Sequence, residues 1–184
     1  MGVTQSLQTE DIAWAAYDRL SGALGSALVA VQARRTRNPL TLLPPVSISM
    51  GYDDTTIELA ANQFPRVAII AAPRTPEDEG ANERITIATH TLLIEWIVFV
   101  SMRAGVTTHT LKHEVTLIGW RYGEAILDTM MKGRSYAGFS PTNAAPTVDE
   151  GQAVPIRLNR NSSDLSGFIA GGMITIPLRG KYVF

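Results

Sequence analysis

The stretch ITIATHTLLIEWIVFVSM, residues 85–102, decides the fold, because eighteen residues this apolar can form a membrane span, a buried helix or a long strand. Glu95 stands near its middle, and four hydroxyl side chains add to the cost of placing the stretch in a bilayer. Nine of the eighteen residues are β-branched, which favours a strand. Its apolar residues also alternate with a period of two, as in Ile85, Ile87, Leu93, Ile97 and Phe99. The stretch therefore predicts a strand, and a membrane protein is the least favoured class.

The opposite face of this strand is also apolar toward its C-terminal half, so this half should be covered on both sides. Extended at about 3.3 Å per residue, the strand would span roughly 60 Å. A compact domain of this chain length has a diameter of roughly 40 Å. We therefore expect the strand to bend, to break in two at Thr91 to Glu95, or to project onto a neighbouring subunit.

The composition is that of a globular protein with a thinly charged surface. Of the 184 residues, 45% are hydrophobic and 18% are charged, which fits one folded domain over residues 1–184 and hints at burial against other subunits. The absence of cysteine excludes a disulfide framework, a thiolate metal site and a cysteine nucleophile. The formal net charge of −1 argues against a dedicated nucleic-acid binder.

An amphipathic helix of about twenty-five residues is predicted behind Thr9, a plausible N-cap. Its apolar stripe consists of Ile12, Ala16, Leu20, Leu24, Leu28 and Val31. The helix should end at Arg34, Arg35 and Arg37, before Asn38-Pro39. These arginines could contact phosphate, or they could complement the helix dipole.

A second amphipathic helix is predicted after the long strand, capped by Thr107 or Thr108. Its apolar stripe consists of Leu111, Val115, Ile118, Tyr122, Ala125 and Met130. Gly119 and Gly123 lie one turn apart and allow another element to approach closely.

Short strands are predicted at residues 46–50 and 65–73, and the second of these forms a hairpin with the long strand. The polar turn of this hairpin contains Glu77, Asp78 and Glu79, three carboxylates that are suited to a solvated loop or to a ring lumen that repels DNA. Two further strands end the chain. The order of elements predicts an α+β fold, with a mainly antiparallel sheet, a long central strand and packing by both helices.

Residues 133–152 show no periodicity. A loop of this length is uncommon inside a compact domain, so the segment should be an interaction arm or plain disorder. Tyr136 and Phe139 are the candidate anchors of such an arm on a neighbour.

No residue pattern predicts catalysis or a cofactor. His109 and His113 lie four apart with Glu114 beside them, but Thr110 stands where a zincin helix has its glutamate. His90 and Glu95 lie on opposite faces of the strand and cannot form a simple acid–base pair. Glu95 and Trp96 are better explained as core or interface residues. We therefore expect a structural protein, with a metal-dependent enzyme as the less favoured alternative.

The order of elements resembles the tail terminator, or tail-completion, proteins of long-tailed bacteriophages. The likeness rests on the opening helix, the strand FPRVAII (64–70), the acidic turn, the strand THTLLIEWIVFV (89–100) and the helix HTLKHEVTLIGWRYGEAILDTMM (109–131). The longer connection NPLTLLPP (38–45) and the segment 133–152 depart from that layout. A tail-tube protein, another neck or connector protein, or a tube component of a contractile system is therefore the alternative.

The resemblance implies a structural virion protein at the head–tail junction, made in the host cytoplasm and without catalysis or cofactor. Its copies would form a hexameric ring that docks on the last ring of the tail-tube protein, stops tube growth and meets the head connector. DNA would pass through the lumen without specific binding, and no membrane is involved. Candidate interface residues are then Glu95, Trp96, Tyr136 and Phe139, and the acidic turn would face the lumen or the tube.

Overall fold

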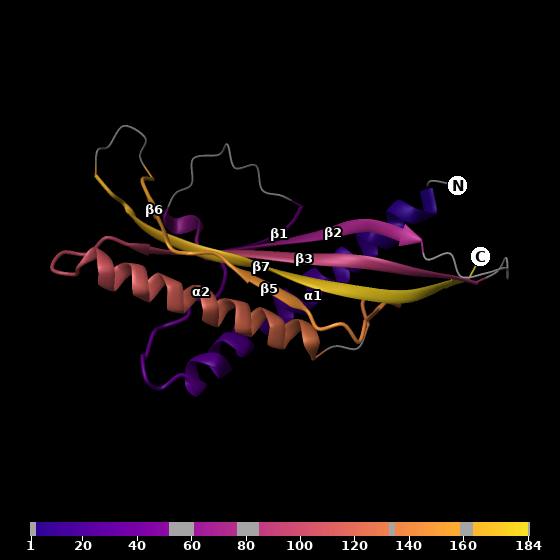
Figure 1. Cartoon of the computed structure of the whole chain (residues 1–184), viewed down its shortest axis with the longest axis horizontal. Helices are drawn as coiled ribbons and strands as arrows, with labels where there is room; N and C mark the ends of the chain where they lie inside the picture. The colour runs from indigo at the N-terminus through magenta and orange to yellow at the C-terminus, as the bar shows by residue number, and fades with distance from the viewer. Residues whose placement is uncertain (1–2, 52–60, 77–84, 133–134, 159–163, 184) are drawn as a thin grey trace.

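The computed structural model describes residues 3–51, 61–76, 85–132, 135–158 and 164–183. They form two layers, a mixed sheet of seven strands and two helices packed on one of its faces (Figure 1). The α+β class is therefore confirmed.

Both helices carry the apolar stripes that the sequence predicted. Helix α1 (Val3–Arg34) begins before Thr9, so Thr9 is not its N-cap, but all six predicted stripe residues are buried. Helix α2 (Thr108–Met131) is capped by Thr107, whose side chain accepts a hydrogen bond from the Thr110 amide at 3.2 Å. Its stripe is also buried, apart from Ile118, which is half-buried.

Three strands make the centre of the sheet, namely β2 (Arg66–Pro76), β3 (Ile85–Ser101) and β7 (Gly167–Val183). They pair antiparallel, whereas β1 (Ser47–Met50) joins β2 in parallel at one edge. The short strands β4 (Ser140–Pro141), β5 (Thr147–Glu150) and β6 (Val154–Ile156) all pair with the outer side of β7. The 3-10 turn η1 (Ala61–Gln63) precedes β2.

The long strand does not break at Thr91 to Glu95, so this one of the three alternatives is excluded. β3 pairs with β7 without interruption, from Ile85 opposite Val183 to Ser101 opposite Gly167. β7 is as long as β3 and satisfies its ladder of hydrogen bonds, so the backbone has no need of a corner. The pair makes the molecule elongated and runs past the C-terminal end of α2 (Figure 1).

Burial alternates along the central strands, because the two helices cover only one face of the sheet. On the covered face the side chains are buried, whereas the opposite side chains are half-buried. We call this second face the open face. It consists of Arg66, Ala68 and Ile70 of β2, Leu93, Glu95, Ile97 and Phe99 of β3, and Ile169, Gly171, Met173 and Thr175 of β7.

Trp96 fixes the distance between α2 and the sheet. Its indole N–H donates to the Gly119 carbonyl at 2.9 Å, and the side chain is 1% exposed. A methyl group on Gly123 would lie 2.7 Å from the ring, and one on Gly172 would lie 2.6 Å from it. The predicted close approach at Gly119 and Gly123 is therefore confirmed: a Cβ on Gly119 would lie 3.3 Å from Ala170 of β7, and Gly123 is required because the Trp96 ring fills the gap.

Changing Gly123 to alanine should lower the free energy of unfolding, although alanine is the better helix former. The helix gains about 1 kcal/mol from the change. The ring is held from both sides and cannot retreat, and overpacking of this kind costs about 1–3 kcal/mol. We therefore expect a net loss of up to about 2 kcal/mol in urea unfolding.

Gly22→Ala in α1 is the matched control, because nothing lies within 4 Å of the position where its Cβ would stand. This variant should be more stable than the parent by about 0.5–1 kcal/mol. If both substitutions changed the free energy of unfolding in the same direction, the role given to the Trp96 ring would be contradicted.

Candidate functional site

Residues 135–152 do not form a projecting arm. β4 and β5 within this segment pair with β7 of the same chain. Tyr136 and Phe139 are 0% and 3% exposed, because the covered face of the sheet and the helices bury them. The prediction that these two side chains anchor an arm on a neighbour was therefore wrong.

Tyr136 is fixed by two groups of its own chain. Its hydroxyl donates to the Met130 carbonyl near the end of α2. The Arg19 guanidinium lies 4.2 Å from the ring centroid and donates to the carbonyls of Met130 and Ser135. Phe139 packs edge-on against His90, with ring centroids 4.7 Å apart. The start of the segment thus closes the end of the core where α1 and α2 meet.

Tyr136→Ala should destabilise the monomer by about 3–5 kcal/mol, because it empties a fully buried site. Tyr136→Phe keeps the ring and removes only one hydrogen bond, so it should cost about 1 kcal/mol. Urea unfolding of the two variants measures both values. If Tyr136→Ala unfolded at the parent's midpoint, this part of the core would be wrongly assigned.

Two buried tyrosines make the fold sensitive to alkaline pH. Burial raises the pKa of Tyr122, whose hydroxyl donates to the Leu43 carbonyl. Burial also raises the pKa of Tyr136, against the opposing charge of Arg19. The folded state resists losing these protons, so their contribution is complete below the unfolded pKa of about 10 and is lost as pH rises through the folded values.

The melting temperature should therefore fall as pH rises above about 10, where unfolded tyrosine ionises. Tyr122→Phe removes one of the two ionisable groups, so its decline above this pH should be shallower than the parent's. Thermal melts across the alkaline range test this, with Tyr17→Phe as the control for a half-buried tyrosine. Equal slopes for the parent and Tyr122→Phe would contradict the assignment.

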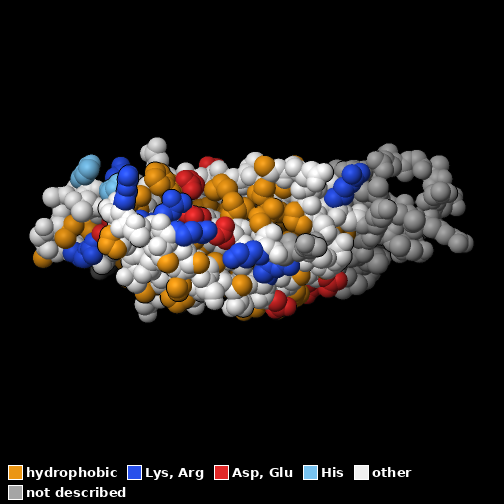
Figure 2. Space-filling model, turned by 90° about the horizontal axis from the view of Figure 1, so that it is seen from below, with side chains coloured by type: hydrophobic (Ala, Val, Ile, Leu, Met, Phe, Trp, Pro, Cys, Tyr) orange, Lys and Arg blue, Asp and Glu red, His pale blue; other side chains and the backbone are white. Residues whose placement is uncertain are grey.

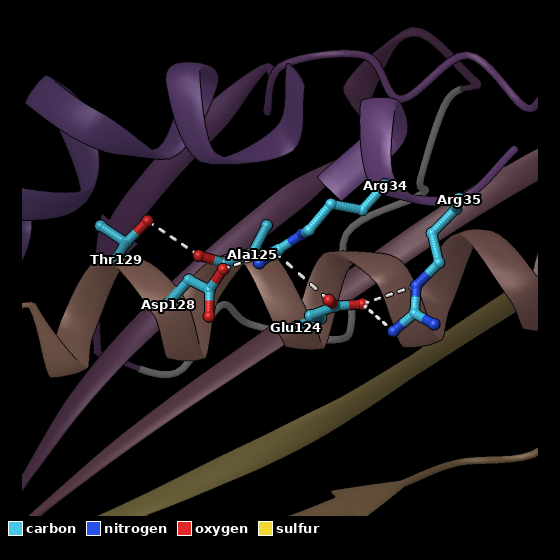
Figure 3. Close-up of polar contacts among 6 residues, drawn as sticks. All are labelled: Arg34, Arg35, Glu124, Ala125, Asp128 and Thr129. Carbon is cyan, nitrogen blue, oxygen red and sulfur yellow. Dashed lines mark hydrogen bonds and ion pairs between the residues drawn. The ribbon is translucent and has the colours of Figure 1, made fainter. Parts of the chain in front are cut away.

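Two arginines at the end of α1, Arg34 and Arg35, point toward carboxylates of α2 on the surface of the molecule (Figure 3). Arg34 contacts Asp128 at 2.6 Å and Glu124 at 3.3 Å, and Arg35 contacts Glu124 at 2.6 Å. The hydrogen bond to Asp128 raises the pKa of Arg34. These ion pairs join the two helices, while the side chains of Arg34 and Arg35 remain 52% and 54% exposed, so their phosphate-facing role stays a prediction. Arg37 is exposed in the following turn.

The other residues predicted to form sites do not come together within the described ranges. Glu77, Asp78 and Glu79 lie outside the described residues. His109 and His113 are exposed on α2, and Glu114 is engaged by Arg103. Within the described ranges, no group of three side chains is arranged to hold a metal ion. The metal-dependent alternative therefore lacks a third ligand in this part of the chain.

The two interface candidates in the long strand, Glu95 and Trp96, lie on opposite faces of the sheet. Trp96 is 1% exposed, so of its two predicted roles the core is confirmed and the interface is excluded. Glu95 is half-buried on the open face, and its side chain forms no hydrogen bond or ion pair within the described ranges. His90 lies on the covered face and is 1% exposed, so the prediction that His90 and Glu95 point apart is confirmed.

A cleft of about 510 Å³ opens between α2 and β5 on the helix side, and we call it the helix-side cleft. Seen from the side of α2, hydrophobic side chains lie beside charged ones along the middle of this face (Figure 2). The cleft is lined by Arg35, Leu117, Trp120, Arg121, Gly123, Glu124, Leu127, Val148 and Glu150.

Arg121 is the unusual residue of this cleft. It is 7% exposed, and its Nη1 has no hydrogen-bond partner among the described residues. Sequence reasoning missed it, although a signal was present. Arg121 follows Ile118 by three residues and precedes Ala125 by four, so it falls within the apolar stripe of α2. A charge in that position is buried unless the neighbouring element opens a cleft.

A second hollow of about 420 Å³ lies on the open-face side, and we call it the sheet-side groove. Its lining includes Glu95, Ile97, Asp149, Ile169, Gly171 and Met173. Glu95 and Asp149 both stand opposite Met173 in the ladder, so the two carboxylates lie in one row across the sheet. The helix-side cleft thus carries an unpaired cation, and the sheet-side groove carries carboxylates in apolar surroundings.

Comparison with protein-family models and with curated proteins gives no match to this sequence. None of the described helices combines the length and apolarity that a membrane crossing needs. The likeness to tail terminators therefore rests on the order of elements, and the surfaces described above carry the functional argument.

Proposed function

We propose that this chain is a structural subunit of the head–tail junction of a long-tailed phage, of the tail terminator kind. Its copies assemble into a ring, hexameric by resemblance, that caps the tail tube, ends its polymerisation and joins it to the head connector. The observation that carries this proposal is the open face, an apolar sheet surface on the two longest strands of the molecule.

The open face supports assembly because it is continuous over three strands and mostly apolar. Ile70, Leu93, Ile97, Phe99 and Met173 are all half-buried within it. A contiguous apolar surface of this kind is typical of a protein–protein contact, since a monomer gains nothing by exposing it. Burial against another subunit would remove this surface from water, as hydrophobic association requires.

The edges of the sheet support the same proposal. β1 lies at one edge, and the short strands β4, β5 and β6 lie at the other. Sheet edges present unpaired backbone groups, and closure into a ring is one way in which assemblies cover them. The formal net charge of −1 suits a lumen that lets DNA pass without retaining it. No cofactor takes part in this function.

The test is to add the purified full chain to tail tubes from the same phage and to image the mixture by negative-stain microscopy. We expect one ring at one end of each tube, and tubes assembled in its presence should stop growing. Mass photometry of the chain alone reports whether rings form before docking. Bovine serum albumin at equal mass is the control for non-specific binding.

Open-ended stacks of the chain would overturn the terminator function in favour of a tail-tube or contractile-system tube protein. A chain that ignores both tubes and connectors would overturn the whole assignment to the head–tail junction.

A further inference from the structure

Arg121 is a buried cation without a charged partner among the described residues. Only 7% of the residue is exposed, and no carboxylate within the described residues forms an ion pair with it. Removing a guanidinium from water is costly unless hydrogen bonds and an opposite charge replace the lost hydration. The helix-side cleft is therefore incomplete as an isolated site, and a carboxylate is the group that would complete it.

The carboxylates already in this cleft do not meet that need. Glu124 is occupied by Arg34 and Arg35 at 3.3 and 2.6 Å. Glu150 is exposed, and desolvation raises its pKa, whereas an ion pair with Arg121 would lower it. The carboxylate must come from outside the cleft.

Apolar side chains beside Arg121 indicate a protein partner. Trp120 and Val148 are 48% and 42% exposed, and Leu117 and Leu127 also line the cleft. Exposed tryptophan next to a buried arginine is the composition of an interface hot spot.

Glu95 supplies the complementary surface on the same molecule. It is a half-buried carboxylate at the centre of the open face, without a partner in the part of the chain that the structure describes. Beside it, Gly171 stands on the open face opposite Ile97 and gives the sheet-side groove a floor without a side chain. An exposed indole can pack flat against such a floor. The chain thus carries an unpaired cation on one side of its sheet and an unpaired anion on the other.

We propose that the helix-side cleft binds the open face of a second copy of this chain, with Arg121 of one copy paired to Glu95 of the next and Trp120 packed on the glycine floor. The two surfaces lie on opposite sides of one sheet, so the contact is head-to-tail. Head-to-tail contacts produce closed rings or open helices, never isolated pairs alone. The inference rests on the proposed ring and names the contact that builds it.

The first test measures self-association of the full chain by sedimentation velocity over a concentration series. Arg121→Met removes the charge and keeps the apolar stem, and Glu95→Gln removes the opposite charge. Each should weaken association about thirtyfold or more, because either change leaves one buried charge unpaired. The double variant should be no weaker than the weaker single variant. Asp18→Asn, an equal change of charge on the exposed surface of α1, should leave association unchanged.

Urea unfolding separates this role from a merely structural one. Arg121→Met should fold as stably as the parent or more so, because an uncompensated buried charge has been removed. A less stable Arg121→Met monomer with unchanged association would overturn the proposal. A parent chain that stays monomeric up to its solubility limit would overturn it as well.

Charge exchange gives the sharper test. Arg121→Glu and Glu95→Arg should each fail to assemble alone. Mixed in equal amounts they should assemble, because every head-to-tail contact in an alternating ring then joins opposite charges. A mixture that stays monomeric would exclude this pairing. The proposed function would survive that result if the parent chain still capped tail tubes, so the two failures are distinguishable.

Discussion

The packing of Trp96 between Gly123 and Gly172 is the constraint on which the rest of the structure depends. The ring occupies the gap between α2 and the sheet, and its N–H satisfies a carbonyl in the helix. This position sets how closely α2 lies on β3 and β7, and α2 in turn holds α1 through the pairs from Arg34 and Arg35 to Glu124 and Asp128. A single aromatic side chain and three glycines thus determine the spacing of the two layers.

The layer of helices covers only one face of the sheet, so the other face forms part of the surface of the molecule. The strands are apolar on both faces, yet the described residues form two helices, and both pack on the same side. The remaining face is left half-buried along three strands. A strand that is apolar on both faces needs a second covering layer, which another subunit can supply. The excess of apolar surface is the physical basis for the proposed assembly.

The charged side chains fall into two groups, those paired within the chain and those without a described partner. Most described ion pairs hold elements of one chain together, as at the junction of α1 with α2 and between Arg103 and Glu114. Arg121 and Glu95 differ, because each is at least half-buried and neither forms an ion pair with another described residue. Unmatched buried charges are rare in stable monomers, since each costs free energy without return. Their opposite signs on opposite sides of the sheet are what a repeating contact requires.

The sequence by itself determined the class of fold, both helical stripes, a cap at Thr107 or Thr108, the strand character of residues 85–102 and the close approach at Gly119 and Gly123. These features depend on local periodicity and on steric limits that are written in neighbouring residues. It could not determine the parallel pairing of β1, the unbroken course of β3, or the burial of Tyr136 and Phe139, because each depends on residues distant in the chain. β7 supports β3 from more than sixty-five residues away, and Arg19 meets Tyr136 across more than a hundred. Only the tertiary structure decided that Arg34 and Arg35 are paired and that Arg121 is not, since a charge gains or loses its partner when the chain folds.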